Sequence, residues 1–188
     1  MKTLLVTGAA GYLGGCLLRA PRMGMRGPRG PQLIGGPQLI GGPYLIGTFH
    51  RTRPDLPVPL YPLDLRDLDA TRRLLADLRP DAILHTALSN NSPEEIAAIP
   101  LAAQNLARAA RETGARLVHL STDIIWDGSA PPYAADAPPS PINEYGRAKA
   151  DADALVRDLY PQAAIARPSL IWGFDPLDKQ TRWLVEGL

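Results

Sequence analysis

The sequence feature that most constrains the fold of this chain is an apolar run that ends at a glycine. Residues 2–7 read KTLLVT, and Gly8, Gly11 and Gly14 follow within one short stretch. A continuous apolar run of this length is typical of a strand that is buried on both faces of a parallel sheet. From residue 12 onward, apolar side chains recur at helical spacing. The sequence therefore predicts a strand, a glycine-rich turn and a helix in direct succession.

Strand and helix patterns alternate along the rest of the chain. Short apolar runs predict further strands at 44–49, 58–65, 81–88, 115–121 and 163–169. Amphipathic or capped segments predict helices at 67–78, 92–114 and 143–160, the second of them kinked by Pro100. This order favours an α/β fold of the Rossmann type, a doubly wound parallel sheet with helices on both faces.

A Pro/Gly-rich repeat separates the first predicted helix from the second predicted strand. PQLIGG at 31–36 recurs at 37–42, and PYLIGT at 43–48 is a diverged third copy. Three hexamers are too few and too short for a solenoid, and the closely spaced prolines and glycines exclude a helix. We interpret 21–43 as an insertion that arose by local duplication. Packing on the domain surface, or pairing as a short ribbon, is the alternative.

The composition narrows the classes of partner. The net charge of +1 over 188 residues provides no strong field for nucleic acid or an anionic membrane. No apolar run is long enough to span a bilayer, and the N-terminal run is too short and glycine-broken for a secretory signal. The single cysteine, Cys16, excludes an internal disulfide and fits a reducing compartment. We expect a cytoplasmic protein without a metal site.

The glycines after the first strand have the spacing G-x-x-G-x-x-G. Gly8 allows a tight turn, Gly11 lets the backbone approach a pyrophosphate, and Gly14 allows close helix packing. The amino terminus of the following helix then faces the phosphates. The motif predicts a dinucleotide site that Tyr12 and Leu13 also contact. A glycine turn without a ligand is the alternative.

The end of the second predicted strand indicates which dinucleotide is bound. Sites selective for NAD usually carry an acid here for the ribose 2′-hydroxyl. This chain has His50, Arg51 and Arg53, and no acid before Asp55. Since arginine pairs bidentately with phosphate, we expect His50 and Arg51 to favour NADP(H) over NAD(H). The alternative is a solvated basic loop.

Tyr145 and Lys149 lie four residues apart in a predicted helix and therefore share one face. A tyrosine with its usual pKa of about 10 is a poor acid–base group at neutral pH. A nearby ammonium would stabilise the phenolate and lower the pKa of Tyr145. Lys149 would also reach the nicotinamide ribose. An ordinary solvated helix face is the alternative.

Hydroxyl side chains follow the fifth predicted strand at Ser121 and Thr122, with Asp123 next. Ligands bind at the carboxyl edge of such sheets, so a hydroxyl here can reach a substrate carbonyl oxygen. These hydroxyls could instead satisfy loop backbone.

The motifs TGAAGYLG, HLSTD and YGRAK, in this order, resemble those of extended short-chain dehydrogenases/reductases. The resemblance covers roughly 1–20 and 44–175, and dTDP-4-dehydrorhamnose reductases are the most similar branch. It implies that Tyr145 donates the proton to a carbonyl, that Lys149 tunes Tyr145, and that Thr122 orients the substrate. Asp123 would be an assisting acid.

The same resemblance implies further cofactor contacts and a domain plan. It places Asp64 and Leu65 at the adenine, Ala87 in the cofactor channel, and Arg167 and Ser169 near the nicotinamide. Residues 1–175 would form an NADP(H)-binding domain, and 176–188 would begin a substrate domain that is otherwise missing. Asn105 is out of register with an asparagine that these relatives often carry, whose position falls near Ile99.

The implied function is NADPH-dependent reduction of a 4-keto sugar nucleotide, in a protein that can form a homodimer. One alternative is an NADP-binding regulatory subunit without turnover, which an incomplete substrate domain would suit. Another is an NAD-dependent sugar-nucleotide epimerase or dehydratase, which the basic residues after the second strand oppose. A truncated product without activity is the third.

Overall fold

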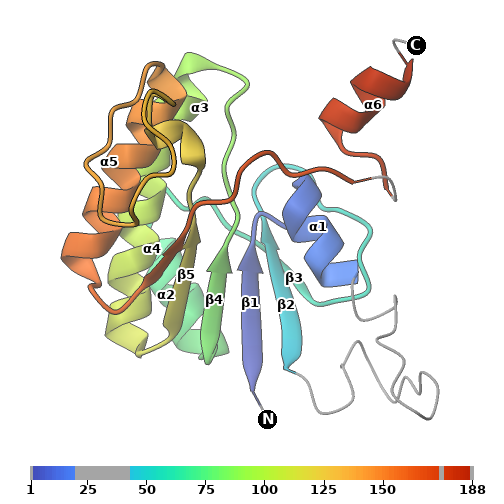
Figure 1. Cartoon of the computed structure of the whole chain (residues 1–188). Helices are drawn as coiled ribbons and strands as arrows, with labels where there is room; N and C mark the ends of the chain where they lie inside the picture. The colour runs from blue at the N-terminus through green and yellow to red at the C-terminus, as the bar shows by residue number, and fades with distance from the viewer. Residues whose placement is uncertain (1, 20–42, 174–175, 187–188) are drawn as a thin grey trace, which may run out of the picture.

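The computed structural model describes residues 2–19, 43–173 and 176–186, in which six strands form one parallel sheet (Figure 1). The strands are β1 (Thr3–Thr7), β2 (Tyr44–Phe49), β3 (Leu60–Pro62), β4 (Ala82–His85), β5 (Arg116–Leu120) and β6 (Ala164–Ala166). The helices are α1 (Tyr12–Arg19), α2 (Leu68–Leu78), α3 (Pro93–Ala97), α4 (Ile99–Thr113), α5 (Glu144–Leu159) and α6 (Lys179–Glu186), and η2 (Asp123–Ile125) is a 3₁₀ turn. The strand order β3-β2-β1-β4-β5-β6 confirms the predicted Rossmann-type fold.

The helices cover both faces of this sheet, as predicted. In Figure 1, α2, α4 and α5 lie on one face and α1 lies on the other. Successive side chains of a strand point to opposite faces, so Leu5 packs with Ile83 and Leu106 while Val6 packs with Leu18. Since both faces are covered, the ligand-binding edge is the one where the strands end.

Several predicted elements differ in extent from the observed ones. The strands predicted at 81–88 and 163–169 are shorter, at Ala82–His85 and Ala164–Ala166, and two further differences have a clear cause. The strand predicted at 58–65 pairs only over Leu60–Pro62, because prolines at 59 and 62 have no N–H for the ladder. The helix predicted at 92–114 is two helices, α3 and α4, that meet at Ala98. Pro100 therefore breaks this helix rather than kinking it, since proline at the start of α4 cannot continue α3.

The third hexamer of the repeat provides β2, which pairs with β1 from Thr3↔Tyr44 to Val6↔Gly47. The first two copies, 31–42, and nearly all of the predicted insertion lie outside the described residues. Of the helices in the described ranges, none combines the length and the apolar character needed to cross a bilayer.

Candidate active site

The glycine turn packs so closely that side chains are excluded from two of its positions. Gly8 has φ of +78°, and a Cβ there would lie 2.6 Å from the Cα of Ala87. A Cβ on Gly14 would lie 2.4 Å from the Gly8 carbonyl oxygen. The Gly11 N–H donates to that same oxygen at 2.9 Å. The turn therefore holds the start of α1 against the ends of β1 and β4, a cradle that fits a dinucleotide pyrophosphate.

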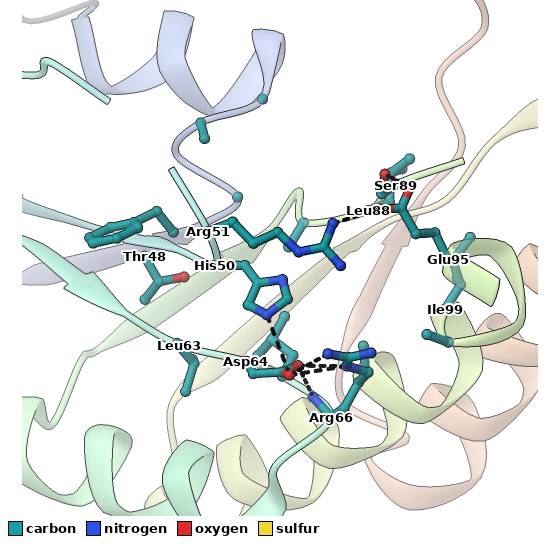
Figure 2. A pocket seen from close by; sticks show the side chains of 18 of the residues that line it. Thr48, His50, Arg51, Leu63, Asp64, Arg66, Leu88, Ser89, Glu95 and Ile99 are labelled. Atoms are coloured by element: carbon teal, nitrogen blue, oxygen red, sulfur yellow. Dashed lines mark hydrogen bonds and ion pairs between the residues drawn. The ribbon is translucent and has the colours of Figure 1, made fainter. Parts of the chain in front are cut away.

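A cavity of about 840 Å³ opens beside this turn, at the edge where β1, β2 and β4 end (Figure 2). The cofactor residues predicted from the sequence that line it are Gly8, Gly11, His50, Arg51, Asp64, Leu65 and Ala87. Its size and its position at the carboxyl edge suit the adenosine part of a dinucleotide.

Asp64 is the centre of a polar cluster in this cavity. It accepts hydrogen bonds from Arg66 Nε at 2.9 Å and Arg66 Nη2 at 2.6 Å, and its carboxylate lies 3.4 Å from His50 Nε2. The hydrogen bonds from Arg66 lower the pKa of Asp64 to about 2. Asp64 is thus a charged acceptor at neutral pH. Sequence reasoning missed Arg66, although it stands two residues after Asp64 in the same loop.

Arg51 also has an acidic partner in the cavity. Its guanidinium lies 3.4 Å from the carboxylate of Glu95 on α3, and Figure 2 shows the two side chains directed toward each other. Glu95 accepts a second hydrogen bond from the Ser89 hydroxyl. The Ser89 hydrogen bond and the charge of Arg51 lower the pKa of Glu95. Sequence reasoning missed Glu95 and Ser89, since only the fold brings α3 and the segment before it close to the end of β2.

Asn105 has a structural position rather than one in the site. Its side chain is 3% exposed, and Nδ2 donates to the carbonyl oxygens of Leu65 and Arg66 at 3.0 Å. Asn105 thereby fastens α4 to the loop that carries Asp64. Ile99 lines the cavity instead.

The predicted catalytic residues meet beyond this cavity, around the amino-terminal end of α5. Asn143 caps α5 by accepting a hydrogen bond from the Gly146 N–H at 2.7 Å. A Cβ on Gly146 would lie 2.6 Å from the Ile124 carbonyl oxygen, so α5 packs directly on η2. This contact places Tyr145 near Asp123.

The electrostatics of Tyr145 differ from the expectation. Burial and the negative charge of Asp123 raise the pKa of Tyr145, whereas we expected Lys149 to lower it. Lys149 is 1% exposed, and its ammonium donates to the Leu120 carbonyl at 2.6 Å; among the described residues it has no hydrogen bond to Tyr145. Burial lowers the pKa of Lys149 to about 8. Tyr145 is consequently a protonated phenol at neutral pH.

Thr122 and Asp123 form a small turn at the end of β5. The Thr122 hydroxyl caps η2 by accepting from the Ile124 N–H at 3.3 Å, and it lies 3.4 Å from the Asp123 carboxylate. The Asp123 N–H donates to the Pro168 carbonyl at 3.4 Å, so this turn adjoins the end of β6.

The remaining predicted cofactor residues lie outside the cavity lining. Arg167 forms an ion pair with Asp153 at 2.9 Å and donates to the Ala135 carbonyl. Ser169 is exposed on the segment after β6. Tyr12 donates from its hydroxyl to the Pro176 carbonyl at 3.2 Å, and Leu13 is half-buried on α1. Their contacts with a cofactor stay predictions.

Two curated proteins illustrate the similarity in sequence. The chain is 35% identical over 118 residues to methionine adenosyltransferase 2 subunit beta from Xenopus laevis, a match to 59% of this chain and 35% of that protein. It is 28% identical over 176 residues to the probable low-salt glycan biosynthesis reductase Agl14 from Haloferax volcanii, a match to 89% of this chain and 53% of that protein. The matched part of this chain thus spans about half of the reductase and less of the subunit.

Two solved structures illustrate the similarity in fold. The dTDP-4-dehydrorhamnose reductase from Bacillus anthracis, in complex with NADP, has a TM-score of 0.63 and 25% identity over 90% of this chain and 54% of that one. The enzyme WbmH from Bordetella bronchiseptica, in complex with NAD+, has a TM-score of 0.69 and 18% identity over 92% of this chain and 56% of that one. Residues 1–179 match the family described as the RmlD substrate binding domain. The chain belongs to the RmlD substrate-binding domain family.

Proposed function

We propose that this chain is the cofactor-binding part of an oxidoreductase that uses NADPH to reduce a 4-keto sugar nucleotide. The observation that carries the proposal is the pairing of a half-buried Tyr145 with a fully buried Lys149 on one face of α5. Burial of a lysine side chain costs free energy, and ionisable groups perturbed by burial cluster at functional sites. Tyr145 and Lys149 lie at the same edge of the sheet as the glycine turn. The family supports the same class of substrate.

In this proposal the protein orients the substrate and supplies a proton. A bound nicotinamide supplies the hydride. Thr122 donates a hydrogen bond to the substrate carbonyl oxygen, and Tyr145 transfers its phenolic proton to that oxygen. The raised pKa of Tyr145 keeps the proton in place until it is needed. The charge of Lys149 then stabilises the phenolate until solvent returns the proton.

NADP(H) is the cofactor that we propose. Arg51 and His50 follow β2 and line the cavity, so they are the groups that would hold a 2′-phosphate. Arg66 adds a second guanidinium to the same cavity, although it is paired with Asp64 in this structure. NAD, which would need an acid at the end of β2, is the alternative.

A second candidate function is NADP binding without turnover. It rests on the 35% identity over 118 residues to methionine adenosyltransferase 2 subunit beta, which by its name is one subunit of a larger enzyme. The Tyr145–Lys149 pair argues against it, since a protein that only binds the cofactor has no use for a buried lysine beside a phenol.

A fluorescence titration with NADPH and, separately, NADH tests these functions, followed by assays with dTDP-4-keto sugars. Saturable binding that favours NADPH, together with oxidation of NADPH when the sugar is added, supports the reductase. Binding without turnover supports the second candidate. Absence of binding by a chain that circular dichroism shows to be folded would contradict both.

A further inference from the structure

A cluster of buried ionisable side chains lies behind the proposed catalytic pair. Lys149 is 1% exposed and Asp153 is 2% exposed. The two residues are one helical turn apart on α5, so their side chains share a face. Asp153 is therefore a source of negative charge for a lysine that the protein has removed from water.

Asp153 is shared with a second cation, Arg167. Arg167 Nε donates to Asp153 Oδ2 at 2.9 Å, and only 12% of the arginine side chain is exposed. The other carboxylate oxygen, Asp153 Oδ1, has no hydrogen-bond partner among the described residues. Because Arg167 is the direct partner, it neutralises part of the charge that would otherwise act on Lys149.

Two histidines complete the cluster without adding charge. His119 Nε2 lies 3.5 Å from Asp153 Oδ1, and the rings of His119 and His85 are 5.1 Å apart. Burial lowers the pKa of both histidines, so both are neutral at pH 7. The groups that face Lys149 and Asp153 are thus His85 on β4, His119 on β5, Arg167 after β6, and Tyr145 on α5.

The charges of this cluster do not cancel. Lys149 and Arg167 provide two positive charges and Asp153 provides one negative charge. Asp123 adds a second negative charge beside Tyr145, so the surplus positive charge of the cluster is offset there. In the resting protein, burial lowers the pKa of Lys149 to about 8, and Asp153 opposes this fall.

We propose that Asp153 is a positioning residue that keeps the Lys149 ammonium charged inside the protein, and that Arg167 limits this effect by pairing with the same carboxylate. The importance of the device for catalysis rests on the proposed function, because Lys149 acts there through Tyr145. The electrostatic relationship itself requires neither cofactor nor substrate. It can therefore be measured on the chain alone.

The test is an NMR titration of the chain labelled with ¹³C at the lysine Cε. The sequence has only three lysines, Lys2, Lys149 and Lys179, so the spectrum is simple. Lys2→Arg and Lys179→Arg identify the Lys149 signal by elimination. Asp153→Asn should lower the Lys149 midpoint by about one pH unit, since the opposing charge is lost and Arg167 is left unpaired. Arg167→Gln should raise it, since Asp153 then acts on Lys149 alone.

Opposite shifts of the Lys149 midpoint in Asp153→Asn and Arg167→Gln distinguish this role from a purely structural one. In a purely structural role, both variants would loosen the site, expose Lys149 to water and shift its midpoint in the same direction. Arg167→Lys keeps the charge and should leave the Lys149 midpoint close to that of the wild type, with one added lysine signal that is absent from the wild-type spectrum. Asp151→Asn, on the exposed side of α5, is the matched control for a lost carboxylate. Shifts in the same direction, or an unchanged midpoint in both folded variants, would overturn the proposal.

If Asp153→Asn does not fold, Arg167→Gln alone tests the proposal. A Lys149 midpoint that is unchanged or lower in Arg167→Gln would then contradict it. A failure of the proposed function has a different signature. The chain would then not reduce a keto sugar, while the Lys149 titration would still show the two opposite shifts.

Discussion

The guanidinium of Arg51 lies 3.4 Å from the carboxylate of Glu95, so the residue proposed to hold a 2′-phosphate already has an anionic partner (Figure 2). The arginine side chain is 72% exposed. An ion pair with one partner this exposed contributes little to stability, about 1 kcal/mol or less. A phosphate can therefore displace Glu95 from Arg51 at a small cost in free energy. Until a phosphate binds, Glu95 holds the Arg51 side chain near the cavity.

Replacement of Arg51 by aspartate should separate the two cofactors. Arg51→Asp removes the proposed 2′-phosphate ligand and adds a repulsive charge, so the Kd for NADPH should rise by about tenfold or more while that for NADH changes little. Fluorescence titrations of both cofactors measure this. Arg53→Asp, which makes the same charge change outside the cavity lining, is the control. Equal losses for NADPH and NADH would exclude the 2′-phosphate role.

Removal of the charge on Glu95 should have the opposite effect. Glu95→Gln frees Arg51 from its competitor, and NADPH should bind about two- to fivefold more tightly, with NADH nearly unchanged. Asp77→Asn, an exposed carboxylate on α2, controls for the change in net charge. Weaker NADPH binding in Glu95→Gln would show that Glu95 supports the site rather than competing for it.

Tyr145→Phe should retain the cofactor and lose the reaction. The ring keeps its packing, so NADPH affinity should stay within about twofold, while kcat for a keto sugar falls by about 10²- to 10⁴-fold. Tyr44→Phe, at the start of β2 and thus at the opposite edge of the sheet, should leave both quantities unchanged. Reduction that survives in Tyr145→Phe would assign the proton to another group.

A comparison of Gly8 and Gly128 separates two causes by which a glycine-to-alanine substitution lowers stability, steric crowding of the added methyl group and strain in the backbone. Both have φ near +80°, but a Cβ on Gly128 meets no atom within 4 Å. Gly128→Ala should therefore cost only about 1–2 kcal/mol of unfolding free energy. Gly8→Ala also forces a methyl against the backbone of Ala87 and should cost about 3 kcal/mol or more, with loss of NADPH binding. Urea denaturation compares the two variants, and equal costs would contradict the close approach at Gly8.

The acid stability of the chain should depend on Asp64. Its pKa is about 2 in the folded protein because of Arg66, below the ordinary value of 3.8. The unfolded chain takes up this proton first, so the contribution of Asp64 is present above about pH 4 and is lost as the pH falls toward 2. Asp64→Asn should lose less stability over this interval than the wild type. Urea midpoints measured across this interval for the wild type and Asp64→Asn check the prediction, and an equal loss in both would contradict it.

The sequence predicted the order of elements because buried parallel strands and capped helices leave local patterns. Ser92 caps α3 and Gly114 closes α4 in a left-handed conformation, at the two ends of the segment 92–114 that was predicted as helical. The break at Ala98 was harder to foresee. Pro100 marks a disturbance in the helix, but whether the chain kinks or restarts depends on how α4 packs on its neighbours.

The polar contacts of the cavity could not be predicted in the same way. Arg51 and Glu95 are 44 residues apart, and only the parallel sheet brings their loops together. The spacing of Tyr145 and Lys149 correctly predicts a shared face, yet it does not say which acceptor the ammonium reaches. That acceptor, the Leu120 carbonyl, belongs to β5, so the pKa of Tyr145 is set by burial and Asp123 instead.

The strand β2 begins at Tyr44, at the edge of the sheet opposite the one where the cavity lies. The register of β2 is fixed by β1 on one side and β3 on the other. A change in chain length before Tyr44 that keeps both ladders should therefore leave Arg51 beside the cavity. Such length variants should keep their cofactor affinity, because the entropy cost of closing a loop grows only slowly with its length.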